Sequence, residues 1–135
     1  MIKNTFLLFI LLAALASCSN NKKSTPVTDV EVATAFVRDI LDNDFADAEQ
    51  FLLKDETNSD LFKRFQKQYA QKDKAVLEKY KGADIIVNET SYVTDSIFIF
   101  NYSNSYMRES KTKLKLVRIN GKWLIDLKYT FSGNL

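Results

Sequence analysis

The sequence contains no histidine and a single cysteine, Cys18. Without histidine, the chain lacks the most common general base at neutral pH and the most common metal ligand. One cysteine excludes an internal disulfide, and a Cys–His catalytic pair is excluded as well. Proline occurs once and glycine three times, while 46% of the 135 residues are hydrophobic. This composition predicts one globular domain rather than a collagen-like or broadly disordered chain.

Motifs for phosphate, metal and nucleic acid are also missing. The chain has no glycine-rich phosphate loop, no Cys or His cluster, and no helix-turn-helix, RNA-recognition or zinc-finger pattern. Asp42, Asn43, Asp44 and Asp47 lack the glycine and the final glutamate of a calcium-binding loop, and we interpret them as helix caps. The sequence therefore predicts no cofactor, no metal and no nucleic-acid partner.

The first 17 residues have the layout of a secretory signal peptide. Lys3 precedes an apolar run over residues 6–16. As a helix over 5–17, this segment would be about 20 Å long, whereas a hydrocarbon core is about 30 Å thick. The segment therefore predicts export rather than a permanent transmembrane span.

Leu15, Ala16, Ser17 and Cys18 follow the apolar run and resemble the lipobox of bacterial lipoproteins. Small side chains at Ala16 and Ser17 let an extended backbone enter the signal-peptidase cleft, and the Cys18 thiol is the nucleophile for a diacylglyceryl group. The resemblance implies cleavage before Cys18 and a further acyl chain, such as palmitate, on the new amine. Several buried acyl chains form a stable membrane anchor, at about 0.8 kcal/mol per CH₂. The alternative is an ordinary signal peptide followed by a chance cysteine.

Residues 18–28 are interpreted as the lipidated cysteine and a flexible tether, because 19–28 are polar and lack apolar periodicity. In enterobacterial lipoproteins, an aspartate directly after the cysteine retains the protein in the inner membrane, and here that residue is Ser19. Surface-exposed lipoproteins of Bacteroidota often carry acidic residues there, whereas this tether has Lys22 and Lys23. The resemblance thus implies a bacterial cell-envelope protein, in the outer membrane and facing the periplasm.

Charge is distributed unevenly along the domain. Residues 29–60 contain ten acidic and two basic residues, whereas 61–135 contain fourteen basic and seven acidic residues. We interpret this as an acidic helical half packed beside a basic sheet half, with a polybasic binding face as the alternative. Lys111, Lys113 and Lys115 are likewise interpreted as a solvated strand face, and a strip that touches anionic lipid or glycan is the alternative.

Helical periodicity dominates the first half of the domain, which we place at residues 29–135. Apolar residues at steps of three and four predict a helix from Asp29 to near Asn43. A short helix capped by Asn43 or Asp44 follows. A third helix, with Thr57 and Asp60 spaced as a capping box, breaks its register over 71–74 and ends at Gly82. The residues expected to face inward are Val32, Ala33, Phe36, Val37, Ile40, Leu41, Phe45, Ala48, Phe51, Leu52, Leu61, Phe62, Phe65, Tyr69, Val76, Leu77 and Tyr80.

Beyond Gly82 the period changes to two, which predicts strands over 85–87 and 96–103. Asn120 and Gly121 suit a type I′ turn that joins strands over 111–119 and 122–130. Opposed residues in such a hairpin have numbers that sum to 241. The predicted core face pairs Leu114 with Leu127, Leu116 with Ile125, and Arg118 with Trp123, whose ring its guanidinium stacks on. The predicted solvent face pairs Lys113 with Lys128, Lys115 with Asp126, and Val117 with Leu124.

Helices followed by a run of strands predict an α+β fold with an antiparallel sheet. The lipobox, the tether, the segment VATAFVRDILDNDFADAEQFL and the terminal LKLVRINGKWLIDL resemble small bacterial lipoproteins with a lumazine-binding-like domain. These lipoproteins have unknown function and fall in the nuclear-transport-factor-2-like superfamily, and the similarity covers residues 27–135. The resemblance implies a cone, in which N-terminal helices pack on a curved antiparallel sheet and leave a pocket at the open end.

That superfamily contains enzymes and binding domains, so the fold alone leaves the function open. The predicted function is a lipid-anchored envelope lipoprotein with a non-catalytic domain that binds a small apolar ligand or an envelope protein partner. The candidate pocket residues are Phe98, Phe100, Tyr102, Trp123 and Tyr129, which as ordinary core residues would have no binding role. The alternative is a small pocket enzyme of the ketosteroid-isomerase-like type. Its carboxylate and tyrosine candidates, to which no motif assigns a role, are Asp84, Asp95, Asp126, Tyr92, Tyr102 and Tyr129.

Overall fold

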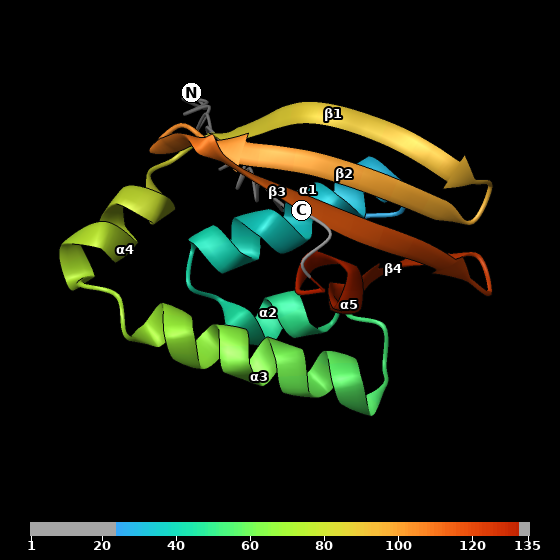
Figure 1. Cartoon of the computed structure of the whole chain (residues 1–135), viewed down its shortest axis with the longest axis horizontal. Helices are drawn as coiled ribbons and strands as arrows, with labels where there is room; N and C mark the ends of the chain where they lie inside the picture. The colour runs from blue at the N-terminus through green and yellow to red at the C-terminus, as the bar shows by residue number, and fades with distance from the viewer. Residues whose placement is uncertain (1–23, 133–135) are drawn as a thin grey trace, which may run out of the picture.

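The computed structural model describes residues 24–132, in which helices precede a four-stranded sheet (Figure 1). The predicted α+β class is confirmed. The predicted signal peptide, lipobox and lipidation site at Cys18 lie outside the described residues. The elements are α1 (Asp29–Leu41), α2 (Phe45–Glu49), α3 (Glu56–Ala70), α4 (Lys74–Lys81), β1 (Ile85–Thr94), β2 (Ile97–Asn104), β3 (Met107–Ile119), β4 (Lys122–Asp126) and α5 (Leu127–Thr130).

Helix α1 begins with a capping box that the sequence analysis did not identify. The Thr28 hydroxyl accepts a hydrogen bond from the Glu31 backbone N–H, and the Glu31 carboxylate accepts one from the Thr28 N–H. Both bonds satisfy backbone donors that the first turn of a helix leaves without partners. The predicted apolar stripe of this helix is confirmed, because all six of its residues are buried.

The predicted starts of the next two helices are right in one case and wrong in the other. Asp44 caps α2, as expected. Helix α3, however, is capped by Asp55, whose carboxylate accepts from the Asn58 backbone N–H at 2.7 Å. The expected capping box is not formed, because Thr57 and Asp60 already lie inside the helix. A carboxylate three residues before Asn58 can reach the free N–H groups of the first turn, so the helix starts earlier than predicted.

The expected break in the third helical segment is confirmed. Helix α3 ends at Ala70 and α4 begins at Lys74, with Gly82 as its C-cap. The chain then enters β1, which runs to Thr94 and is longer than the strand predicted over 85–87.

The sheet is antiparallel throughout, with the strand order β1-β2-β3-β4. The predicted hairpin register is confirmed, because Lys115 pairs with Asp126 and Arg118 with Trp123. Asn120 and Gly121 both have positive φ angles, as a type I′ turn requires. The Arg118 guanidinium lies 5.8 Å from the centre of the Trp123 ring, as the predicted stacking implies.

The predicted last strand over 122–130 is wrong in its second half. Strand β4 stops at Asp126, and Leu127 begins the short helix α5. The expected pairs of Leu114 with Leu127 and of Lys113 with Lys128 are therefore not formed within the sheet. Leu127 is nevertheless buried in the core, and Lys128 points its ammonium to Asp55.

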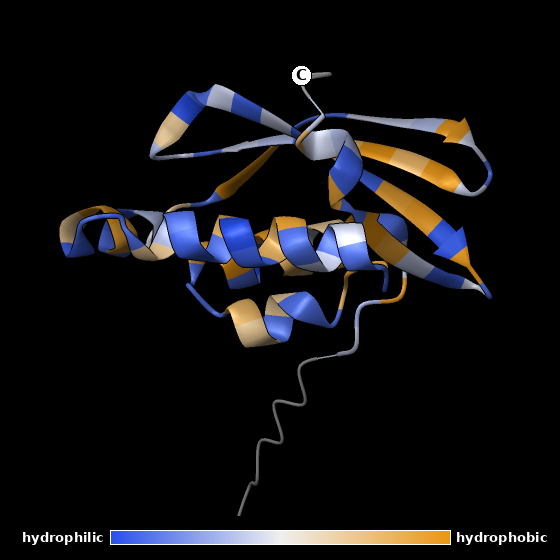
Figure 2. Cartoon of the chain, turned by 60° about the horizontal axis from the view of Figure 1, so that its bottom comes forward, coloured by the Kyte–Doolittle hydropathy of each residue, from blue (hydrophilic) through white to orange (hydrophobic). Residues whose placement is uncertain are grey.

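The helices pack on one face of the sheet, and the hydrophobic core lies between them (Figures 1 and 2). Phe98 and Phe100 of β2 and Leu116 of β3 face this core and are at most 2% exposed. Residues that alternate with them face the other side, which we call the outer face. Within residues 24–132, no helix is both long and apolar enough to cross a membrane.

Candidate functional site

A small hollow lies between the inner face of the sheet and the helices. Its volume is about 190 Å³, and its walls come from α1, α3, β2, β3 and α5. Because β4 stops at Asp126, α5 turns across the end of the sheet and forms one wall. We call this hollow the inner pocket. It is lined by Phe36, Phe65, Tyr102, Thr112, Leu114, Leu127, Thr130 and Phe131.

The inner pocket is mainly apolar, with hydroxyl groups at fixed places. Burial raises the pKa of the Tyr102 phenol to about 12, and a hydrogen bond with Thr112 opposes this shift. The Thr130 hydroxyl donates a hydrogen bond to the Lys113 carbonyl at 2.8 Å, so its proton is not available to a ligand. Apolar walls with few polar groups are typical of small-molecule sites. Because its pKa is raised, the Tyr102 phenol is neutral at physiological pH.

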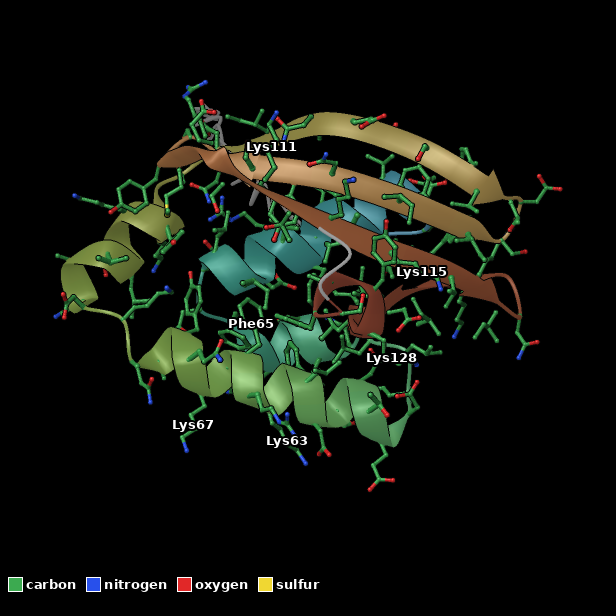
Figure 3. The ribbon with its side chains drawn as sticks, in the orientation of Figure 1. Lys63, Phe65, Lys67, Lys111, Lys115 and Lys128 are labelled. Carbon is green, nitrogen blue, oxygen red and sulfur yellow. The ribbon has the colours of Figure 1, made fainter. Side chains whose placement is uncertain are left out.

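Phe65 and Phe131 pack against each other at the edge of the inner pocket. Their ring centres are 5.7 Å apart, and Phe131 is 44% exposed. Figure 3 shows Phe65 on the side of α3 that faces the rest of the domain, whereas Lys63 and Lys67 point away from it. Because Phe131 is partly exposed, this edge of the inner pocket lies at the surface of the domain.

A second buried phenol lies among the aromatic residues of α3 and α4. Tyr69 is 3% exposed, and its hydroxyl has no hydrogen-bond partner among the described residues. Burial raises the pKa of Tyr69 to about 12. Its ring packs on Phe45 and Tyr80, with centres 5.4 and 5.7 Å away. Tyr69 is thus a core residue, and a buried hydroxyl without a hydrogen-bond partner among the described residues lowers the stability of the core.

The structure separates the five residues predicted to line a pocket. Only Tyr102 lines the inner pocket. Phe98 and Phe100 are packed in the core, and Tyr129 is half-buried on α5 outside the two hollows described here. Trp123 lines a different hollow, near the start of α1. Phe36 and Phe65 were expected only as inward-facing helical residues, since periodicity shows that a residue is buried but not what it faces.

The hollow that Trp123 lines has a volume of about 570 Å³ and opens widely to solvent. We call it the tether-end hollow, because residues 27–29 form part of it. It brings together Tyr92 and Asp95, two of the enzyme candidates, with Asp29, which the sequence analysis did not single out. Its lining is Val27, Thr28, Asp29, Tyr92, Asp95, Arg118 and Trp123.

Asp29 and Tyr92 are directly hydrogen-bonded in the tether-end hollow. The Tyr92 hydroxyl donates to one carboxylate oxygen of Asp29, which raises the pKa of the phenol. The other oxygen accepts from the Val30 backbone N–H at 2.6 Å. Both oxygens of this carboxylate are thus engaged. The contact ties β1 to the start of α1 and gives both carboxylate oxygens a structural role.

Asp126, predicted to face solvent, is instead 6% exposed. It does lie beside Lys115, with Oδ2 and Nζ 3.6 Å apart. Its Oδ1 accepts from the Lys128 backbone N–H, which caps α5, and from the Asn58 side chain at 3.4 Å. These contacts, made after the chain leaves the sheet, account for the burial. Asp126 is therefore a structural carboxylate at the corner between β4 and α5. Asp84, the remaining acidic candidate, is exposed in the segment before β1.

Within residues 24–132, no group of three or more His, Cys, Asp or Glu side chains is arranged to hold a metal ion. No family model, curated protein or solved structure matches the chain. Its function must therefore be argued from its own residues.

The ion pair of Asp55 with Lys128 predicts a specific dependence of stability on pH. Lys128 Nζ lies 2.6 Å from Asp55 Oδ2, and this contact, with the Asn58 N–H, lowers the pKa of Asp55 from 3.8 to about 2. Folding therefore favours the ionised form, and its contribution is complete above about pH 5 and is lost as the pH falls through about 2. We expect Asp55→Asn to make the free energy of unfolding fall less steeply between about pH 5 and pH 2, as measured by urea denaturation.

The matched control for this pH dependence is Asp60→Asn, an exposed aspartate on the same helix. It should retain the slope of the unchanged chain. Equal slopes for the unchanged chain and Asp55→Asn would show that the ion pair contributes nothing to acid sensitivity.

Proposed function

We propose that this chain is a lipid-anchored protein of the bacterial cell envelope whose domain binds a small, mainly apolar molecule without chemical conversion. The anchoring part depends on Leu15, Ala16, Ser17 and Cys18. The binding part depends on one structural observation, the inner pocket with its neutral Tyr102 phenol. In this proposal the outer membrane holds the anchor, and the domain faces the periplasm.

The arrangement of the domain supports the finer proposal of a nuclear-transport-factor-2-like cone. Helices precede an open antiparallel sheet and pack on one of its faces (Figure 1). The inner pocket lies between these two layers, where such a cone would hold its ligand. The assignment to lumazine-binding-like domains also depends on the resemblance of residues 32–52 and 114–127 to small bacterial lipoproteins with such a domain.

The size and lining of the inner pocket suggest the class of ligand. A volume of about 190 Å³ is smaller than the roughly 300–1,000 Å³ of sites for drug-sized molecules. Phe36 and Phe65 offer aromatic contacts, and the Tyr102 hydroxyl offers a polar one. We propose a compact ring compound with one or two polar groups.

The alternative, a ketosteroid-isomerase-like enzyme, would require a carboxylate free to accept a proton from the substrate. The tether-end hollow has a buried aspartate beside a tyrosine, but both oxygens of Asp29 already accept hydrogen bonds. Asp95 in the same hollow is exposed. This arrangement favours binding over proton transfer.

Filling the inner pocket provides the test of ligand binding. We expect Thr112→Phe to weaken binding of 2-naphthol, a fused two-ring phenol, by at least about tenfold, because the new ring occupies the ligand's volume. Binding would be measured by titrating the full mature chain and following the fluorescence of 2-naphthol. Thr112 is on β3, where an aromatic residue is compatible with a strand.

Thr90→Phe is the matched control, because it makes the same substitution at an exposed position of β1. It should leave the affinity for 2-naphthol unchanged. Equal affinities for the unchanged chain and Thr112→Phe, or no saturable binding to either, would count against the inner pocket as a ligand site.

A further inference from the structure

The outer face of the sheet carries a continuous group of aliphatic side chains. They alternate with the buried core residues of the same strands, so they point away from the helices. Ile119 is 44% exposed, and the other four are half-buried. We call this group the outer patch. Its members are Ile97, Ile99, Val117, Ile119 and Leu124.

The strand register makes the outer patch contiguous. Ile97 pairs with Val117, and Val117 pairs with Leu124, so three neighbouring strands contribute adjacent side chains. None of the described helices covers them, because all the helices pack on the opposite face (Figure 1). The exposed face of an antiparallel sheet normally carries polar residues, and a contiguous apolar patch marks a contact surface.

Lysines continue the same face along β3. Lys111, Lys113 and Lys115 alternate in step with Val117 and Ile119, so they share the outer face with the patch. Figure 3 shows Lys111 and Lys115 along this strand, on the other side of the domain from Lys63 and Lys67. Lys122 lies opposite Ile119 at the tip of the hairpin. An aliphatic surface bordered by cations is suited to a membrane with anionic headgroups.

The predicted anchor lies close to this surface along the chain. Thr28 follows Cys18 by ten positions, and an extended chain of this length spans at most about 35 Å. The start of α1 is held to β1 by the bond between Asp29 and Tyr92, and Thr94 of the same strand pairs with Ile97 of the patch. A tether this short gives the domain a high effective concentration at the membrane, so even weak contacts are populated.

We propose that the outer patch and the row of Lys111, Lys113 and Lys115 dock on the anionic lipid surface in which Cys18 is anchored. The inference depends on the proposed lipid anchor. Docking through the outer face leaves the helical layer and the opening of the inner pocket free to receive a ligand. The aliphatic side chains enter the interface, and the lysines contact lipid phosphates.

A site-specific quenching experiment tests the docked face. Ile119→Cys in the full mature chain places a fluorescent label on the outer face, and Lys63→Cys places the same label on the exposed side of α3 as the control. The chain is reconstituted in vesicles of phosphatidylethanolamine and phosphatidylglycerol that contain a nitroxide-labelled lipid. We expect quenching at position 119 to be at least about threefold stronger than at position 63, and to weaken at high salt.

Equal quenching at both positions, or stronger quenching at position 63, would overturn the docking proposal. Leu124→Cys repeats the measurement from β4, so a local disturbance at Ile119 cannot decide the result. A label at 119 that no lipid quencher reaches, together with a doubled mass in solution, would show a second copy on this face and overturn the proposal as well.

Failure of the anchor has a different signature in this experiment. A second label on the variant chain, counted by mass spectrometry, would report an unmodified Cys18 thiol. Equal quenching at positions 119 and 63 on a chain that carries one label would instead overturn docking alone, because an acylated Cys18 would then hold the domain at the vesicles without a preferred face. The two proposals are thereby tested separately.

Discussion

Replacement of Asn58 by alanine should lower the free energy of unfolding by about 3 kcal/mol. Asn58 is fully buried, and its side chain joins α3 to the corner between β4 and α5. Its Oδ1 accepts from the Leu127 backbone N–H at 2.8 Å. Its Nδ2 donates to the carboxylates of Asp55 at 2.9 Å and Asp126 at 3.4 Å. Removing the amide leaves a buried N–H and a buried carboxylate short of partners, and each such loss costs about 1–3 kcal/mol.

Urea denaturation followed by circular dichroism measures this loss as a lower midpoint. Gln66→Ala, at an exposed position of the same helix, is the control and should change stability by less than about 0.5 kcal/mol. Because Leu127 and Thr130 form one wall of the inner pocket, Asn58→Ala should also weaken binding of 2-naphthol. A midpoint unchanged from that of the parent chain would contradict the assigned role.

Local patterns in the sequence predicted several elements whose contacts are local. The α1 stripe was readable because residues three and four apart share one face of a helix. The register of the last hairpin was readable because a two-residue turn at Asn120 and Gly121 permits only one alignment. The break after Ala70 appeared as a loss of helical period.

The corner after β4 was missed because its cause lies elsewhere in the chain. Residues 122–130 alternate as a strand would, and the pattern has no signal that ends the strand at Asp126. The decisive partner is Asn58, 69 residues before Leu127 in sequence. The Asn58 side-chain oxygen accepts a hydrogen bond from the Leu127 N–H, and its side-chain nitrogen donates one to Asp126. The chain therefore leaves the sheet after Asp126 and begins α5. Tertiary hydrogen bonds thus override the local period.

The two hollows were missed for a related reason. Periodicity identifies Phe36 and Phe65 as inward-facing, but it cannot show that a space remains between them and Tyr102. The bond of Asp29 with Tyr92 spans 63 residues and belongs to no motif. Of the predicted pocket residues, Phe98 and Phe100 instead fill the core. Pockets depend on how complete layers fit together, and a single segment does not encode that fit.

Replacement of Cys18 by serine should abolish acylation and leave the chain as an uncleaved precursor. A serine hydroxyl is a far weaker nucleophile than a thiolate, so no diacylglyceryl group is transferred and the lipoprotein peptidase has no substrate. Metabolic labelling with radioactive palmitate should fall to background, and the chain should migrate at the larger size of the precursor. The free energy of unfolding of the domain should stay within about 0.5 kcal/mol, because position 18 precedes residues 24–132, whose contacts form the core.

Ser19→Ala is the matched control for Cys18→Ser, since it changes the neighbouring residue and keeps the thiol. It should retain both palmitate labelling and the mature size. A Cys18→Ser chain that is processed to the mature size and stays in the membrane fraction would show that an ordinary signal peptide, and not a lipobox, directs export. Docking by the outer patch would then have to hold the domain at the membrane without acyl chains, and a single weak surface contact seldom does so.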